Sequence, residues 1–281
     1  MVNKLLKQLD NRPLRWILII IIRIMYAIRS DENILKVFYD HTFRVWGYQF
    51  KTHFFWNTGP GWITGKQYFA SQLLHYFANQ YQPKKGDVVI DLGAGLGEEM
   101  IVLAGWVGDR GKVYSIEATP RIAQALVFAK EANHLRNVSV INVAINNKSE
   151  TVEISDEAGY VGNTIQAVIQ NKINLFEVRG LTLDDFFQEH GIKHVDLLKV
   201  NIEGAEQFMI MGMDNAVSKI KNIAISCHDF RVSLNGESEF YRTLDKVKSY
   251  FDSKGFKTWV LPTEDVLQSH IVFGKNLAFN Q

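Results

Sequence analysis

Hydrophobic and polar residues alternate in blocks along residues 86–281, where short apolar runs are followed by longer amphipathic stretches. The stretch at 121–133 has apolar residues at helical spacing. Buried strands that alternate with helices are typical of a parallel sheet with helices on both faces. We therefore predict an α/β fold whose first strands are the apolar runs at 87–93, 112–118, 137–143, 195–200 and 222–227.

The sequence of the last part of the chain predicts an antiparallel connection, unlike the strand–helix repeats before it. A helix is expected around residues 237–253, and two short strands follow at 257–262 and 270–274. These strands are close enough in sequence to pair as an antiparallel hairpin at the sheet edge, where Pro262 is tolerated at a strand end. The segment that begins at Thr182 resembles a capping box, which predicts a short helix before the fourth strand.

Residues 1–30 have a third pattern, because residues 14–28 are almost entirely apolar. The uncharged run from Trp16 to Ile22 is too short to span a membrane and lacks the cleavage site of a secretory signal. We predict a basic, apolar helix for which two interpretations stay open. It lies in a membrane interface with Trp16 and Tyr26 near the headgroups, or it packs on its own domain or a second subunit.

Composition and charge exclude some classes of function. The 281 residues are 47% hydrophobic and 22% charged, which is ordinary for a globular protein. The overall net charge of +1 combines +5 in residues 1–30 with −4 in the rest. We therefore expect no nucleic-acid partner, and the basic N-terminus favours the membrane interpretation. With Cys227 as the one cysteine, we expect a cytoplasmic protein, peripheral at the inner face of a membrane.

A glycine-rich loop is the most informative motif. Three alternate glycines follow the first strand and open a helix, which is the context of a nucleotide-binding loop. Glu117 closes the second strand, where a carboxylate can accept hydrogen bonds from ribose hydroxyls. A dinucleotide fingerprint would need glycine at position 98, and Glu98 beside Glu99 would repel a pyrophosphate. S-adenosyl-L-methionine, which is cationic and has no phosphate, fits better. Its expected contacts are Asp91, Gly93, Ala94, Gly95, Gly97, Glu98 and Glu117.

The segment 195–206, which reads VDLLKVNIEGAE, resembles the FkbM family of S-adenosylmethionine-dependent methyltransferases. That family typically shows a strand of the form I-D-L-L-K-I-D-x-E-G-x-E. Lys199, Glu203, Gly204 and Glu206 match it, whereas Asn201 stands where an aspartate is usual. The resemblance extends from about residue 86 to 230. It implies the class I methyltransferase fold, a Rossmann-like sheet of seven strands with the last antiparallel, and O-methylation of a hydroxyl.

The expected reaction needs a group that removes the proton of the acceptor hydroxyl. His228 is the first candidate because it follows the fifth strand and titrates near neutrality, with Glu203 and Glu206 as runners-up. Lys199 is expected to hold one of these carboxylates or the carboxylate of the cofactor, and Asn201 to hydrogen-bond the cofactor. For His228 a polar loop, and for Lys199 a plain salt bridge, remain open. No spacing rule points to a metal site, so none is expected.

We divide the chain into a helix at 1–30, an extension with a possible lid at 31–85, and a methyltransferase domain at 86–281. In the extension, the aromatic segment 54–65 either covers the ligand or packs on the domain, and packing is slightly preferred. The expected activity is O-methylation of a saccharide, lipid-linked glycan or secondary metabolite. The alternatives are a silent membrane-associated scaffold, favoured by Asn201, and a nicotinamide-dependent dehydrogenase, disfavoured by Glu98.

Overall fold

A computed structural model describes residue 10 and residues 12–29, 34–61, 65–155 and 175–280, and a seven-stranded sheet forms its centre. The strand order is β12-β13-β11-β10-β4-β5-β6, and β13 is antiparallel to both of its neighbours. This is the class I methyltransferase sheet that the sequence predicts. Its strands are β4 (Val88–Leu92), β5 (Lys112–Ile116), β6 (Val138–Ile141), β10 (Val195–Val200), β11 (Ile220–Ser226), β12 (Phe256–Trp259) and β13 (Ile271–Asn276).

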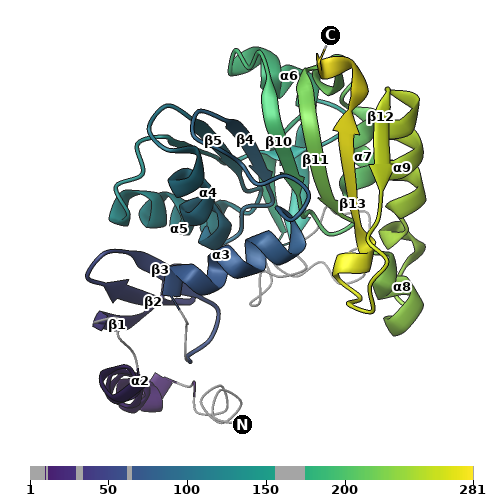
Figure 1. Cartoon of the computed structure of the whole chain (residues 1–281). Coiled ribbons are helices and arrows are strands. Elements are labelled where there is room, and N and C mark those ends of the chain that lie inside the picture. The colour runs from purple at the N-terminus through teal and green to yellow at the C-terminus, as the bar shows by residue number, and fades with distance from the viewer. Residues whose placement is uncertain (1–9, 11, 30–33, 62–64, 156–174, 281) are drawn as a thin grey trace.

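The central strands are buried on both faces, as expected for parallel strands between helical layers. In β4, Val89 packs into one apolar cluster and its neighbour Ile90 into another on the opposite face. Figure 1 shows the two helical layers around the sheet. The first cluster includes residues of α4 (Glu98–Val107) and α5 (Pro120–Ala132). The second includes residues of α6 (Leu183–Glu189), α7 (Glu206–Met211) and α9 (Leu244–Ser253).

Most predicted element boundaries agree with the structure within a few residues, and the predicted hairpin forms as β12 and β13. Thr182 caps α6, since its hydroxyl oxygen accepts a hydrogen bond from the backbone N–H of Asp185 at 3.0 Å. The helix expected around 237–253 begins later, at Leu244. Gly236, with φ of 64°, ends the separate helix α8 (Asp229–Asn235), and a 3-10 turn follows at Glu239–Tyr241.

The N-terminal extension contains the predicted helix, α2 (Arg15–Arg29), which follows a 3-10 turn at Arg12–Leu14. It also contains an antiparallel sheet that the sequence analysis did not predict, formed by β1 (Ile34–Asp40), β2 (Val45–Phe50) and β3 (Phe54–Asn57). Leu18, Ile22 and Tyr26 are buried, and the Tyr26 ring packs against Phe50. One face of α2 therefore packs on its own chain. Across the described residues, no helix is both long and apolar enough to cross a bilayer.

The aromatic segment of the extension packs against helix α5, which covers one face of the central sheet. Trp56 donates its indole N–H to the carbonyl oxygen of Ala125 in α5 at 2.8 Å. Phe54 donates its backbone N–H to the side-chain oxygen of Asn133 at 2.9 Å, and both aromatic rings are buried. Residues 54–57 therefore pack on α5, and residues 62–64 of the expected aromatic segment lie outside the described residues. Helix α3 (Gly65–Tyr76) lies near the strand ends (Figure 1). A further small sheet consists of β7 (Ala144–Ile145), β9 (Leu175–Leu181) and β8 (Thr151–Ser155).

Candidate active site

The glycine loop joins β4 to α4 and lies against the loop that follows β10. Gly93 has φ of 78°, and a side chain there would bring its Cβ to 2.0 Å from the carbonyl oxygen of Asn201. Gly97, with φ of 93°, precedes α4 and packs against Leu126, where a Cβ would lie 2.6 Å from the Leu126 side chain. Glycine is required at both positions, because each combines a left-handed backbone with a close neighbour. The loop thus holds the ends of β4 and β10 together.

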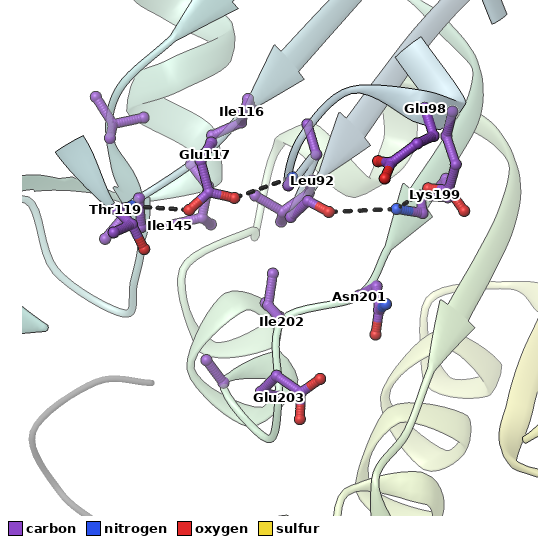
Figure 2. A pocket seen from close by; sticks show the side chains of 18 of the residues that line it. Leu92, Glu98, Ile116, Glu117, Thr119, Ile145, Lys199, Asn201, Ile202 and Glu203 are labelled. Atoms are coloured by element: carbon purple, nitrogen blue, oxygen red, sulfur yellow. Dashed lines mark hydrogen bonds and ion pairs between the residues drawn. The ribbon is translucent and has the colours of Figure 1, made fainter. Parts of the chain in front are cut away.

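A cavity of about 360 Å³ lies beside this loop, a volume typical of small-molecule sites. Figure 2 shows that side chains from three strand ends converge on it, with Glu117 on one side and Glu98 and Lys199 on the other. We call it the cofactor cavity. Its lining includes the loop residues Gly93, Ala94 and Gly95, the acidic residues Glu98, Glu99 and Glu117, the α3 residues Tyr68, Phe69 and Gln72, and Ile145, Ile154, Lys199, Asn201 and Glu203.

Glu117 is held in place by two backbone hydrogen bonds at the end of β5. One carboxylate oxygen accepts the N–H of Gly95 at 3.1 Å, and the other accepts the N–H of Thr119 at 2.8 Å. Burial raises the pKa of Glu117, and these two hydrogen bonds oppose that rise. A carboxylate accepts about four hydrogen bonds, so Glu117 retains capacity for hydroxyl groups of a ligand.

Lys199 is buried and pairs with two carboxylates. Its Nζ lies 2.9 Å from Asp91 Oδ1 and also contacts Glu99, and it donates to the carbonyl oxygen of Gly93 at 3.4 Å. Burial lowers the pKa of Lys199, but the charges of Asp91 and Glu99 outweigh it and raise the pKa above the usual range. Lys199 therefore stays charged and forms the salt bridge considered above. Asp91, for which a direct cofactor contact was expected, is fully buried, lies outside the cavity lining and pairs with the cavity residue Lys199.

Glu98 begins α4 and faces the cofactor cavity. Its neighbour Glu99 is paired with Lys199, whereas Glu98 forms no ion pair with any described residue. Burial, together with the charges of Glu99 and Asp91, raises the pKa of Glu98 to about 7. The partial positive charge of the helix N-terminus is compatible with acidic side chains in this first turn. The cavity therefore presents acidic groups to its ligand, which suits a cation and disfavours a pyrophosphate.

A second cavity, of about 550 Å³, adjoins the first near the ends of β10 and β11. Asn201 and Glu203 line both cavities, so the two spaces meet at these side chains. The side-chain oxygen of Asn201 is buried and has no hydrogen-bond partner among the described residues. The remaining lining of this second cavity combines aromatic and polar groups: Tyr76, Phe77, Ser226, His228, Phe230, Arg231, Asn235, Glu237, Leu267 and Ile271.

Glu203 is fixed by two cations in the loop after β10. Its carboxylate lies 3.3 Å from His228 Nε2 and 2.6 Å from a guanidinium nitrogen of Arg231. Burial works to raise the pKa of Glu203, but His228 and Arg231 hold it below its usual range. The backbone of Glu203 is left-handed, with φ of 53°, which is uncommon for a residue with a side chain. Gly204 follows with φ of 91°, in contact with Phe240.

His228 does not fit the role of base that the sequence suggested. Its Nε2 faces Glu203, and its Nδ1 lies 3.2 Å from the buried carboxylate of Glu206. Burial lowers the pKa of His228, but these two carboxylates outweigh it and raise the pKa to about 10. The ring is therefore protonated at neutral pH and has no free lone pair to accept a proton. Glu206 is fully buried, accepts a hydrogen bond from the Thr243 hydroxyl at 3.0 Å and lines neither cavity.

The structure brings most predicted site residues together. The expected residues Gly93, Ala94, Gly95, Glu98, Glu117, Lys199, Asn201 and Glu203 line the cofactor cavity, whereas Gly97 supports the loop from behind. Sequence reasoning missed two contributions. The first comes from Tyr68, Phe69 and Gln72 of α3, and the second is the guanidinium of Arg231. Neither the α3 residues nor Arg231 lies in a recognisable sequence motif. The one signal is that Arg231 follows the predicted candidate His228 by about one helical turn.

The comparison with known families matches residues 91–258 to the family described as the methyltransferase FkbM domain. This range includes the glycine loop, Glu117 and the Asn201–Glu206 segment. It contradicts the alternative of a nicotinamide-dependent dehydrogenase. Among curated proteins, the chain is 31% identical over 77 residues to a protein-L-isoaspartate O-methyltransferase from Ignicoccus hospitalis. That alignment covers 27% of this chain and 36% of the relative, so the chain spans about a third of the relative's length.

Solved structures with a related shape are distant in sequence. The crystal structure of a methyltransferase FkbM from Methylobacillus flagellatus has a TM-score of 0.49 at 15% identity. It covers 74% of this chain and half of that one. The Aeropyrum pernix fibrillarin, solved with natively bound S-adenosyl-L-methionine, has a TM-score of 0.46 at 16% identity. It covers 86% of this chain and 99% of that one.

Proposed function

The chain belongs to the methyltransferases that carry an FkbM domain, and on that premise we propose that it transfers a methyl group to a hydroxyl oxygen of an acceptor held in the second cavity. S-adenosyl-L-methionine is the methyl donor of the family. The observation that carries the proposal is that two adjoining cavities share Asn201 and Glu203 as lining. A transfer between two bound molecules needs such a junction, because donor and acceptor must be aligned within contact distance.

The residues of the cofactor cavity fit S-adenosylmethionine. Glu117 retains acceptor capacity for ribose hydroxyls, and the apolar side chains of Ile145 and Ile154 suit a flat base. Glu98 offers negative charge for the cationic end, and the unpartnered side-chain oxygen of Asn201 can accept a hydrogen bond. When bound, the cofactor supplies an electrophilic methyl group on a sulfonium.

Glu203 replaces His228 as our candidate for the group that meets the acceptor hydroxyl. Its carboxylate is ionised, and it is the titratable side chain that lines both cavities. A carboxylate held by His228 and Arg231 is a weak base, so its main contribution is to accept the hydroxyl hydrogen bond and orient the oxygen. Proton transfer to Glu203 then accompanies bond formation. Glu206 is a positioning residue, because it acts through His228.

The second cavity supports an acceptor with several hydroxyls. Asn235, Glu237 and Arg231 offer donors and acceptors, while Tyr76 and Phe230 offer aromatic surface. This mixture suits a saccharide, free or lipid-linked, better than a purely apolar metabolite. We further propose that residues 31–85 act as part of the methyltransferase unit, because α3 contributes Tyr68 and Phe69 to the cofactor cavity.

The test combines binding with product chemistry. Calorimetric titration of the full chain with S-adenosylmethionine and with NAD measures which ligand binds, and we expect S-adenosylmethionine alone to do so. Incubation of glycan and lipid extracts with methyl-labelled cofactor then measures transfer. A methyl ether on a hydroxyl is stable to mild alkali, whereas a methyl ester on a carboxyl group releases volatile methanol.

Each outcome of that assay decides between functions. Alkali-stable label in a glycan fraction supports the proposal, and its absence from the Glu203→Gln variant assigns the residue. Alkali-labile label would replace the hydroxyl acceptor with a carboxyl group. Cofactor binding without transfer to any extract would favour the catalytically silent scaffold, for which the substitution of aspartate by Asn201 is the supporting feature.

A further inference from the structure

The helix α2 has a second apolar face that remains exposed after the first is packed on the β1–β3 sheet. Trp16, Ile20, Ile24 and Ile28 follow one another at four-residue spacing and are 62%, 49%, 53% and 75% exposed. We call these four residues the outer face of α2. Side chains four residues apart are neighbours on a helix, so they form one continuous apolar strip. A helix that is apolar on both sides is normally buried on both sides.

We propose that the outer face of α2 docks this protein onto an anionic lipid bilayer, with the helix lying flat in the interface. Two observations fix the flat orientation. A helix of 15 residues is about 22 Å long, shorter than the ~30 Å hydrocarbon core. Its inner face is held on the sheet through Leu18, Ile22 and Tyr26, so the helix remains attached to the protein surface. Figure 1 shows α2 on the outside of the β1–β3 sheet.

Charge selects an anionic surface over a second copy of the chain. Residues 1–30 carry six basic side chains and one acidic side chain, a net charge of +5. Two copies meeting through this face would bring both basic segments together, which like-charge repulsion disfavours. A bilayer with anionic headgroups offers the opposite charge, worth about 1 kcal/mol for each basic residue near the surface.

The arrangement of side chains on α2 also fits an interface. Arg23 is exposed and lies beside the apolar strip, where a long basic side chain can keep its charge among headgroups while its methylenes stay apolar. Trp16 lies at one end of the strip, and indole rings favour the boundary between headgroups and hydrocarbon. Leu35, 57% exposed at the start of β1, adds apolar surface on the strand that α2 packs against.

Vesicle flotation of the full chain tests this proposal. We expect binding to vesicles of phosphatidylcholine mixed equally with phosphatidylglycerol, and much weaker binding to phosphatidylcholine alone. The triple variant Trp16→Gln, Ile20→Gln, Ile24→Gln should lower the apparent vesicle affinity by about tenfold or more, since it removes most of the apolar strip. The matched control replaces three exposed apolar residues elsewhere, Met211→Gln, Phe176→Gln and Leu277→Gln, and should bind as the parent does.

A second variant keeps the test independent of the stability of α2. Arg23→Glu reverses one exposed charge and should weaken binding to the anionic vesicles by roughly fivefold or more. Cofactor binding measured in parallel shows that each variant is folded. Absence of vesicle binding by the parent chain overturns the proposal, as does unchanged binding by the triple variant. A dimer in solution that the triple variant dissociates, without vesicle binding, would assign the outer face to a second copy instead.

Discussion

The two cavities are built in different ways from neighbouring parts of one sheet. One wall of the cofactor cavity is a continuous loop whose glycines bring backbone against backbone, as at Gly93 and Asn201. The second cavity is formed by side chains from distant segments, with Glu203 fixed between His228 and Arg231. The first construction gives a constant surface for a constant ligand. The second can change by substitution without disturbing the first.

Both cavities nevertheless have a buried cation that holds two carboxylates. The two cavities differ in which carboxylates remain facing the open space. Lys199 pairs with both Asp91 and Glu99, and Glu98 and Glu117 are further acidic groups that face this cavity. His228 holds Glu203 and Glu206, and Glu203 remains at the junction. Lys199 is therefore a structural ion at the cofactor cavity, whereas His228 holds the carboxylate of Glu203 where the two cavities meet.

The largest effect is expected from Lys199→Met. This change leaves the buried Asp91 and the half-buried Glu99 without their cation, which lowers the free energy of unfolding by about 3–5 kcal/mol. Urea denaturation measures it. The double variant with Asp91→Asn should recover part of the loss because one buried charge is removed. In the exposed pair of Lys254 and Asp214, Lys254→Met should change stability by less than about 1 kcal/mol. Equal effects of the two lysine changes would contradict a structural ion at Lys199.

The next largest effect is expected from Glu203→Gln, which should distinguish the methyl-transfer step from binding of the cofactor. Glu203→Gln should lower kcat by about a hundredfold, since it removes the proposed acceptor of the hydroxyl proton. The affinity for S-adenosylmethionine should change by less than about threefold, because the amide occupies the same space. The matched control is Glu239→Gln, an exposed carboxylate that pairs with Arg242 outside both cavities, which should have a small effect on kcat. A large loss of cofactor affinity in Glu203→Gln would place this residue in the cofactor cavity alone.

The same difference decides what the sequence could predict. The cofactor side is encoded locally: alternate glycines, a following helix and an acidic residue at the next strand end lie within 27 residues, from Asp91 to Glu117. Periodicity likewise predicted the strands of the central sheet, because strands buried on both faces are nearly continuous apolar runs. These features depend on short-range geometry, so a single sequence suffices to find them.

The second cavity could not be predicted because its parts are distant in the chain. Tyr76 and Phe77, Asn201 and Glu203, Arg231 and Leu267 meet only once the sheet and its helices are packed. His228 was predicted as a base from its position alone, and two carboxylates change its protonation. The β1–β3 sheet was missed for a related reason. Its strands are rich in aromatic residues buried against α2 and α5, so they lack the polar alternation of a half-exposed strand.

A more gradual effect, spread over several pH units, concerns the pH dependence of stability at the second cavity. The pKa of His228 rises from its usual 6.5 to about 10 on folding, so folding takes up a proton above pH 6.5. Its stabilising contribution is complete below pH 6.5 and is lost as pH rises through about 10. The free energy of unfolding should therefore fall over that range by at most about 1.4 kcal/mol per pH unit. Denaturation of the parent and of His228→Gln measures this, and a variant with the same pH slope would contradict the assignment.

The smallest effect is expected at the cofactor cavity and has the opposite direction in pH. Glu98 has a pKa of about 7, and its ionised form attracts a cationic ligand, so S-adenosylmethionine affinity should fall as pH drops through 7. An interaction of about 1 kcal/mol across a solvated cavity corresponds to roughly a fivefold change in affinity. Calorimetric titration at pH 6 and at pH 8, each about one unit from that pKa, measures this change in affinity.

The Glu98→Gln variant should bind weakly and equally at both pH values. Asp109→Asn, a change of an exposed carboxylate outside both cavities, should keep the pH dependence of the parent. If affinity instead rose on acidification, the cavity would favour an anionic ligand group, and the acidic start of α4 would no longer distinguish this site from a dinucleotide site.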